Sequence, residues 1–218
     1  SAQSLYEGVD IPGEGKVALI TYIRTDSTRV SPEAQAAARE FISANYGADY
    51  VPEKPNFYAS KGNVQDAHEA IRPISLDRTP DSLKDSINRN HYRLYKLIYE
   101  RFLASQMSEA KYNSLSADIE CGDYGFKVTG RTPLFPGYTK VYSDKEKDDD
   151  NMKKLPDLSE GDRPAFVEYV YEQKFTKPPA RYTEATLIKA MEEKGIGRPA
   201  TYQPTVSLIE KRAYTERE

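Results

Sequence analysis

Residues 19–31, LITYIRTDSTRVS, are the stretch around which the rest of the sequence is organised. Leu19, Ile20 and Thr21 predict a short buried strand that ends at Tyr22 in a polar turn. Residues two apart share one side of an extended segment, so Tyr22 and Arg24 are expected to point the same way. A guanidinium holds phosphoryl oxygens and favours the phenolate form of a nearby tyrosine. The segment therefore predicts a tyrosine that can attack a phosphate.

A structural role is the alternative to a nucleophilic Tyr22. The chain has 17 tyrosines, and a tyrosine near an arginine is usually a packed ring beside a surface charge. Two more stretches favour the chemical interpretation: QDAHEAIRP at 65–73 and FTKPPARYTEATLIKAMEEKGIGRPATY at 175–202. Together with TYIRTDSTR, and in this order, they resemble the type IA DNA topoisomerases over nearly the whole chain. The lead-in LYEGVDIPGEGKVALITY is most similar to the bacterial topoisomerase I branch.

The resemblance implies an active site. In this family a tyrosine forms a covalent 5′-phosphotyrosyl link with a cut single strand, which assigns that role to Tyr22. The histidine of the second motif contacts the DNA backbone near the scissile phosphate, which implies the same for His68, and Arg24 would stabilise the phosphoryl charge. From chemistry alone, His68 could equally be a capping or hydrogen-bonding residue. Arg72 is expected to contact DNA or to be an ion-pair partner.

The roles of several residues near Tyr22, Arg24 and His68 stay open. Asp26 could cap the turn or help orient Arg24 and the phenol. Glu69 or Asp66 could set the tautomer of His68. Arg29 is expected to be either a DNA-facing charge or a solvent-exposed one.

The segment 174–202 predicts a surface for single-stranded DNA. It combines cations for phosphates with rings for stacked bases, which is what a single-strand groove requires. The expected DNA-binding residues are Lys177, Arg181, Tyr182, Thr183 and Arg198, together with Arg72. Thr183 is also expected to cap a helix. A surface helix pair with ordinary charges would have a similar composition, and the resemblance favours the DNA-binding interpretation.

Periodicity predicts a mainly α chain with a small antiparallel β part, an α+β fold. Caps and apolar spacing predict helices from Ser31 to Gly47, from Thr79 to Met107 with a break near Asn88–Asn90, from Thr183 to Gly195, and from about Thr201 to Arg212. Alternation predicts a hairpin, Tyr112–Cys121 and Tyr124–Gly130, and short strands at Tyr138–Tyr142 and Ala165–Val170. In this pattern Cys121 is expected to be buried.

The predicted domains follow from these elements and the resemblance. Residues 1–108 are expected to form a helical gate domain that carries Tyr22, and residues 109–142 a hinge of β-strands. Residues 143–218 are expected to form part of a single-strand DNA-binding base with a helix-turn-helix or winged-helix unit. The acidic run KEKDDD at 145–150 is expected to be a solvated loop.

Cofactor and location follow partly from what the sequence lacks. Family members hold Mg²⁺ in a Toprim domain with an Asp-x-Asp-x-Glu motif, which this sequence does not contain. The chain is therefore expected to be a central fragment, without a metal site of its own and inactive alone in DNA relaxation. Its partners would be single-stranded DNA and the remaining domains of the same enzyme. One cysteine and no membrane-spanning run favour a cytoplasmic setting, and the resemblance implies a nucleoid-associated protein.

Two rivals belong to other classes. One is a non-catalytic single-stranded DNA-binding module, in which Tyr22 only stacks on a base. The other is a tyrosine recombinase or type IB enzyme, which forms 3′ links and needs a second catalytic arginine and a different motif order.

Overall fold

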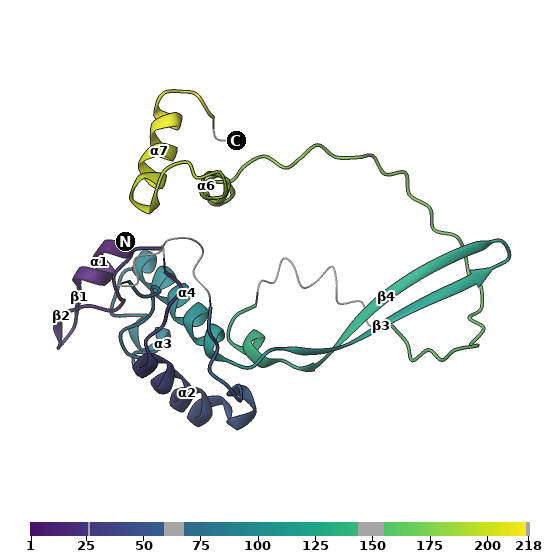
Figure 1. The fold of residues 1–218 in the computed structure, drawn as a ribbon, viewed down its shortest axis with the longest axis horizontal. Coiled ribbons are helices and arrows are strands. Elements are labelled where there is room, and N and C mark those ends of the chain that lie inside the picture. Colours follow the sequence, from purple (N-terminus) through teal and green to yellow (C-terminus); the bar gives the residue numbers. More distant parts are fainter. Residues whose placement is uncertain (26, 59–67, 144–154, 217–218) are drawn as a thin grey trace. The chain divides into compact units, whose positions relative to one another are not determined.

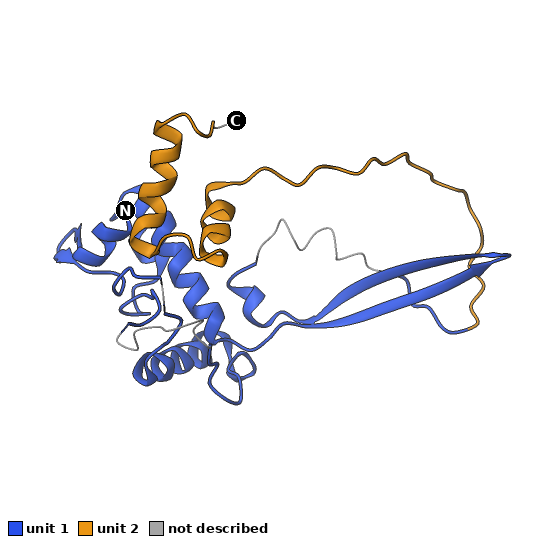
Figure 2. Ribbon diagram, turned by 45° about the horizontal axis from the view of Figure 1, so that its top comes forward, with its two compact units in different colours: residues 1–160 blue, residues 161–218 orange. Residues whose placement is uncertain are grey.

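The computed structural model describes residues 1–25, 27–58, 68–143 and 155–216. The chain divides into two compact units, residues 1–160 and residues 161–218, coloured separately in Figure 2. The domain boundaries predicted at 108 and 142 fall inside the first unit and stay predictions about function. Helices and two antiparallel two-stranded sheets together confirm the predicted α+β fold.

The first unit contains most of the regular structure (Figure 1). Its elements, in chain order, are α1 (Ala2–Glu7), β1 (Val9–Ile11), β2 (Gly15–Val17), α2 (Pro32–Tyr46), the 3₁₀ helix η1 (Ala48–Tyr50), α3 (Pro80–Leu83), α4 (Arg89–Gln106), β3 (Lys111–Cys121), β4 (Tyr124–Phe135) and the 3₁₀ helix η2 (Gly137–Lys140). The apolar core draws on α1, the β1–β2 hairpin, α2 and α4, and on Leu19 and Ile20 between β2 and α2.

Local capping chemistry fixes where the helices begin. The Ser31 hydroxyl accepts a hydrogen bond from the Ala34 amide at 3.3 Å, and Pro32 occupies the first helical position of α2. Thr79 caps α3 in the same way, and Asn88 caps α4 through the His91 amide. A side-chain acceptor satisfies one of the free amides of a first helical turn, which is why these caps are readable in sequence. The predicted starts and the break near Asn88 are confirmed.

The buried face of α4 differs from the predicted one. Apolar spacing in the sequence predicts a buried stripe through Leu94, Leu97, Ile98, the stem of Arg101 and Phe102. Leu94, Ile98 and Phe102 do pack in the core, but Leu97 is 47% exposed. Tyr95 and Tyr99 are buried instead, at 0% and 5% exposure. Their hydroxyls donate to the carbonyl oxygens of Arg78 and Leu76, each at 2.7 Å. A phenol is tolerated in a core when its hydroxyl finds an acceptor, and the loop before α3 supplies two.

These phenols make the stability of the first unit sensitive to high pH. Burial raises the pKa of Tyr95 to about 12 and also raises the pKa of Tyr99. Tyrosines of the unfolded chain ionise near pH 10, so the two phenols contribute fully below pH 10 and lose their contribution as the pH approaches 12. We expect the free energy of unfolding, measured in urea by circular dichroism, to decline over that range. Tyr95→Phe should lessen the decline; a stability unchanged up to pH 12 would contradict the assignment.

The β3–β4 hairpin projects from the helices (Figure 1). Its strands pair from Lys111 with Phe135 to Cys121 with Tyr124, around the predicted turn at Gly122 and Asp123. The hairpin prediction is confirmed, with β4 five residues longer than expected. The predicted burial of Cys121 is wrong: its side chain is exposed, because within the described structure no second layer covers this part of the hairpin.

Two predicted strands are absent from the described residues. Residues 137–140 form the 3₁₀ helix η2 in place of a strand from Tyr138 to Tyr142, since positive φ at Gly137 and the preceding Pro136 start a turn. Residues 165–170 have no regular structure, and their alternating apolar side chains, including Val170 at 87%, are exposed. Alternation alone gives a strand only where a neighbouring strand takes up its backbone hydrogen bonds.

The second unit contains α6 (Glu184–Glu193) and α7 (Pro199–Lys211). Gly195 and Gly197, both at positive φ, make the turn between them, and Met191 and Val206 are buried. The predicted helix pair is thus confirmed, with α7 starting two residues earlier than expected. Within residues 161–216 the structure shows no strand, so the described part has no winged-helix wing.

Candidate active site and nucleic-acid interface

The first two sequence motifs lie side by side in the first unit. Ile20 forms an isolated antiparallel bridge with Pro73, in place of the longer strand predicted at residues 19–22. The Thr21 amide donates to the Arg72 carbonyl at 2.9 Å, and the Ile74 amide donates to the Leu19 carbonyl at 3.0 Å. Further along, the Ala70 amide donates to the Arg29 carbonyl at 2.7 Å. These long-range bonds bring residues 68–74 against residues 19–29.

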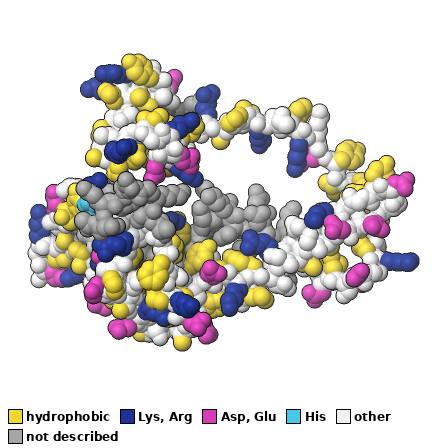
Figure 3. All heavy atoms as spheres, viewed as in Figure 1, with side chains coloured by type: hydrophobic (Ala, Val, Ile, Leu, Met, Phe, Trp, Pro, Cys, Tyr) yellow, Lys and Arg dark blue, Asp and Glu magenta, His cyan; other side chains and the backbone are white. Residues whose placement is uncertain are grey.

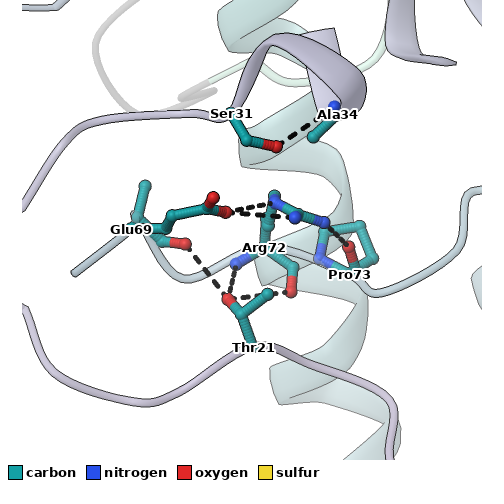
Figure 4. Close-up of polar contacts among 7 residues, drawn as sticks. Thr21, Ser31, Ala34, Glu69, Arg72 and Pro73 are labelled. Carbon is teal, nitrogen blue, oxygen red and sulfur yellow. Dashed lines mark hydrogen bonds and ion pairs between the residues drawn. The ribbon is translucent and has the colours of Figure 1, made fainter. Parts of the chain in front are cut away.

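The Thr21 hydroxyl ties the same two segments together, as Figure 4 shows. It accepts a hydrogen bond from the Arg72 amide at 3.0 Å and donates to the Ala70 carbonyl at 3.1 Å. Leu19 and Ile20, immediately before it, are almost fully buried. The segment before Tyr22 is therefore anchored both in the core and to the His68 motif.

Removing this hydroxyl should loosen the connection. Thr21→Val keeps the shape of the side chain but leaves the partly buried Arg72 amide without that acceptor, at a cost of about 1–3 kcal/mol. We expect a lower urea midpoint for Thr21→Val, measured by circular dichroism at 222 nm. Thr21→Ser, which keeps the hydroxyl, should stay close to the original protein. Equal losses in both variants would show that the hydroxyl does not carry this link.

Tyr22 lies at a shallow pocket of 300 Å³ lined by Thr21, Tyr22, Arg29, His68 and Glu69. Its side chain is 50% exposed, so the ring is partly accessible to solvent. The rings of Tyr22 and His68 are stacked, with centroids 5.7 Å apart and planes at 28°. The ring of Tyr6, on α1, meets the Tyr22 ring edge-on at 5.4 Å. Two aromatic neighbours thus restrict the orientation of the Tyr22 ring.

The arginine that lines the pocket is one whose role the sequence left open. Arg24 is exposed, and it is not among the residues that line the pocket; Arg29 is. Arg72 donates through Nε and Nη2 to the same Glu69 carboxylate oxygen, at 3.1 and 3.0 Å (Figure 4). Of the two roles left open for Arg72, the structure therefore displays the ion pair. The orienting roles predicted for Asp26 and Asp66 lie outside the described residues.

Sequence reasoning did not single out Tyr6 as a neighbour of Tyr22 and left Arg29 undecided. The end of α1 and the β1–β2 hairpin lie between Tyr6 and Tyr22 in the sequence, and no local periodicity links the two residues. Arg29 reaches the pocket through the bond between its carbonyl and the Ala70 amide, which no spacing rule predicts. The lead-in to Tyr22 was nevertheless a usable signal, because it contains Tyr6 within the stretch that resembles the family.

The predicted DNA-binding residues of the second unit are solvent-exposed. Lys177, Arg181 and Tyr182 precede α6 in an extended segment, and Tyr182 is 66% exposed. Thr183 caps α6: its hydroxyl accepts from the Thr186 amide at 3.2 Å. Arg198 is the N-cap residue of α7 and donates from Nη1 to the Gly197 carbonyl at 2.8 Å. Helix capping thus accounts for Thr183, and contact with DNA stays a prediction for all five.

Charge and hydropathy complete the description. On the face drawn in Figure 3, basic and acidic side chains are interspersed. In the part of the chain that the structure describes, no helix is long and apolar enough to cross a membrane. The same described residues bring together no group of three histidine, cysteine, aspartate or glutamate side chains that could hold a metal ion. The Asp148–Asp150 run lies outside them.

Comparison with known proteins identifies the family. A family model described as DNA topoisomerase matches residues 1–218. The fold is similar to that of full-length topoisomerase I from Thermotoga maritima, with a TM-score of 0.77 and 37% sequence identity. The match covers 100% of this chain and 34% of that one, so the chain spans about a third of its relative's length. Motifs, fold and family match agree: the chain belongs to the DNA topoisomerases of type IA, the family of bacterial topoisomerase I.

Proposed function

We propose that this chain supplies the nucleophile of an enzyme that cuts and reseals single-stranded DNA to relax negative supercoils. The observation that carries the proposal is the stacking of Tyr22 on His68 at an open pocket, in a chain of this family. The half-exposed phenol is accessible, and its ring is held by two neighbours. Holding a nucleophile in a restricted orientation increases the fraction of encounters that can react.

The proposed reaction is a transesterification. The Tyr22 hydroxyl oxygen attacks the phosphorus of a phosphodiester, and its proton leaves the phenol. The bond between phosphorus and the 3′ oxygen breaks, that oxygen takes up a proton, and the 5′ end stays linked to Tyr22. His68 and Arg24 stabilise the charge on the phosphoryl oxygens. Because one phosphoester replaces another, the 3′-hydroxyl can reverse the step without a nucleotide cofactor.

The metal ion belongs elsewhere in this proposal. Among the described residues no three histidine, cysteine, aspartate or glutamate side chains come together, and the proposal assigns no step in this chain to a metal. We place Mg²⁺ in a Toprim domain outside residues 1–218 and expect these residues alone to be inactive in DNA relaxation. The proposed partners are single-stranded DNA and the other domains of the enzyme, in the cytoplasm at the nucleoid.

An adduct-polarity assay tests the proposal. Full-length enzyme containing this chain is incubated with Mg²⁺ and an oligonucleotide labelled at its 5′ or 3′ end, then denatured. We expect the 3′ label, downstream of the cut, to stay with the protein and the 5′ label to be released with a free 3′-hydroxyl. The opposite pattern would indicate a 3′-linking enzyme. Binding without any adduct would favour a non-catalytic single-stranded DNA-binding module.

A further inference from the structure

The acid at the wall of the Tyr22 pocket is neutralised from within the protein. Glu69 lines the pocket, and a free carboxylate there would repel a phosphodiester. Its Oε2 atom instead accepts two hydrogen bonds from Arg72, and the two side chains are only 24% and 17% exposed. Arg72 also donates from Nη1 to the Pro73 carbonyl at 3.2 Å. The partly buried pair cancels the charge of Glu69 and fixes its position.

Arg29 lines the same pocket as Glu69. Its amide donates to the hydroxyl of the buried Ser27 at 3.2 Å, and its carbonyl accepts from the Ala70 amide at 2.7 Å. The backbone of Arg29 is therefore held at both ends while the side chain is exposed. Within the described part of the chain, no carboxylate forms an ion pair with this guanidinium. Once Glu69 is neutralised, Arg29 gives the described lining of the pocket a net positive charge.

We propose that Arg29 is a phosphate-binding residue of the Tyr22 site, and that it contacts the phosphodiester which Tyr22 attacks. A guanidinium presents parallel N–H donors that match two oxygens of one phosphate. Placed at the wall of the pocket that Tyr22 shares, it holds the ester beside the phenol and stabilises the negative charge of the transition state. The Arg72–Glu69 pair then acts as a positioning element that keeps the pocket favourable to an anion. This inference rests on the proposed function.

The test compares Arg29→Ala and Arg29→Lys with Arg93→Ala, which removes an exposed arginine of α4. The rate of adduct formation at saturating oligonucleotide is measured in the full-length enzyme, together with the dependence of binding on KCl. We expect Arg29→Ala to slow adduct formation about 10- to 100-fold. The log–log salt slope should become less steep by about 0.7, the value for one phosphate contact on a single strand. Arg29→Lys should keep the slope and recover part of the rate, and Arg93→Ala should change neither.

The possible outcomes distinguish a failure of the Arg29 assignment from a failure of the proposed function. If Arg29→Ala forms adduct as fast as Arg93→Ala while Tyr22→Phe forms none, Arg29 is not a phosphate ligand and the proposed function stands. If Tyr22→Phe still forms adduct, the proposed function itself fails.

A double variant tests the neutralising pair. Arg72→Ala exposes the charge of Glu69 to the pocket and should slow adduct formation. Adding Glu69→Gln should restore most of the rate, because the repulsion is then gone. A double variant as slow as Arg72→Ala would assign Arg72 itself to the DNA and overturn the arrangement proposed for this pocket.

Discussion

Tyr22→Phe is expected to abolish the covalent protein–DNA adduct while leaving single-strand binding nearly unchanged. The substitution removes the attacking oxygen, so no other change at this position isolates the chemistry as cleanly. The contacts of Tyr22 with His68 and Tyr6 are made by its ring, which phenylalanine keeps. The fold and the pocket should therefore persist. The adduct is measured after denaturation, and binding is measured by fluorescence anisotropy of the same oligonucleotide.

Tyr6→Phe is the matched control for this experiment. Tyr6 is also exposed, at 37%, and its ring lies 5.4 Å from that of Tyr22. Tyr6 is the tyrosine among the ring contacts of Tyr22, so its hydroxyl is the alternative nucleophile to exclude. We expect Tyr6→Phe to keep adduct formation, since the edge-on ring contact survives. An adduct that persists in Tyr22→Phe and disappears in Tyr6→Phe would show that Tyr6, and not Tyr22, is the nucleophile.

The sequence predicted best those elements whose determinants are local. The caps Ser31, Thr79, Asn88 and Thr183 mark helix starts, because each supplies an acceptor to its own first turn. The Gly122–Asp123 turn fixes the register of the hairpin in the same local way. Predictions that depended on distant contacts did worse. Tyr95 is buried because a loop brings carbonyl acceptors to it, and Cys121 is exposed because the described structure places no layer over the hairpin.

The candidate site shows the same contrast between local determinants and distant contacts. Tyr22 and His68 were predicted to lie together because two motifs resembled one family, and the structure brings their rings into contact. The hydrogen bonds that cause this run between residues about fifty positions apart, such as Thr21 to Arg72. No periodicity in either segment specifies such a pairing. Arg29 reaches the pocket only through this pairing. For that reason the sequence alone could not show whether Arg29 or Arg24 lines the pocket.

Gly137→Ala is expected to destabilise the first unit by at least about 3 kcal/mol. Gly137 has φ of +48°, where a residue with a side chain costs about 1–2 kcal/mol. A Cβ atom there would also lie within 2.3–2.6 Å of the backbone of Glu109 and Ala110, which cannot move aside as a side chain could. This is the junction between the hairpin and the helices: the Tyr138 amide donates to the Ser108 carbonyl, and the Ser108 amide donates to the Tyr50 carbonyl, each at 2.9 Å.

Gly122→Ala separates the clash from the conformational cost. Gly122 also has positive φ, +60°, but a Cβ atom there would meet no atom within 4 Å. It should therefore show only the cost of the left-handed conformation, and the difference between the two variants measures the clash. Both are followed by urea unfolding with circular dichroism at 222 nm, because the chain contains no tryptophan. Equal losses would mean that the junction relaxes around the added methyl group. A larger loss for Gly137→Ala would show that close packing of backbone at this junction fixes the base of the hairpin.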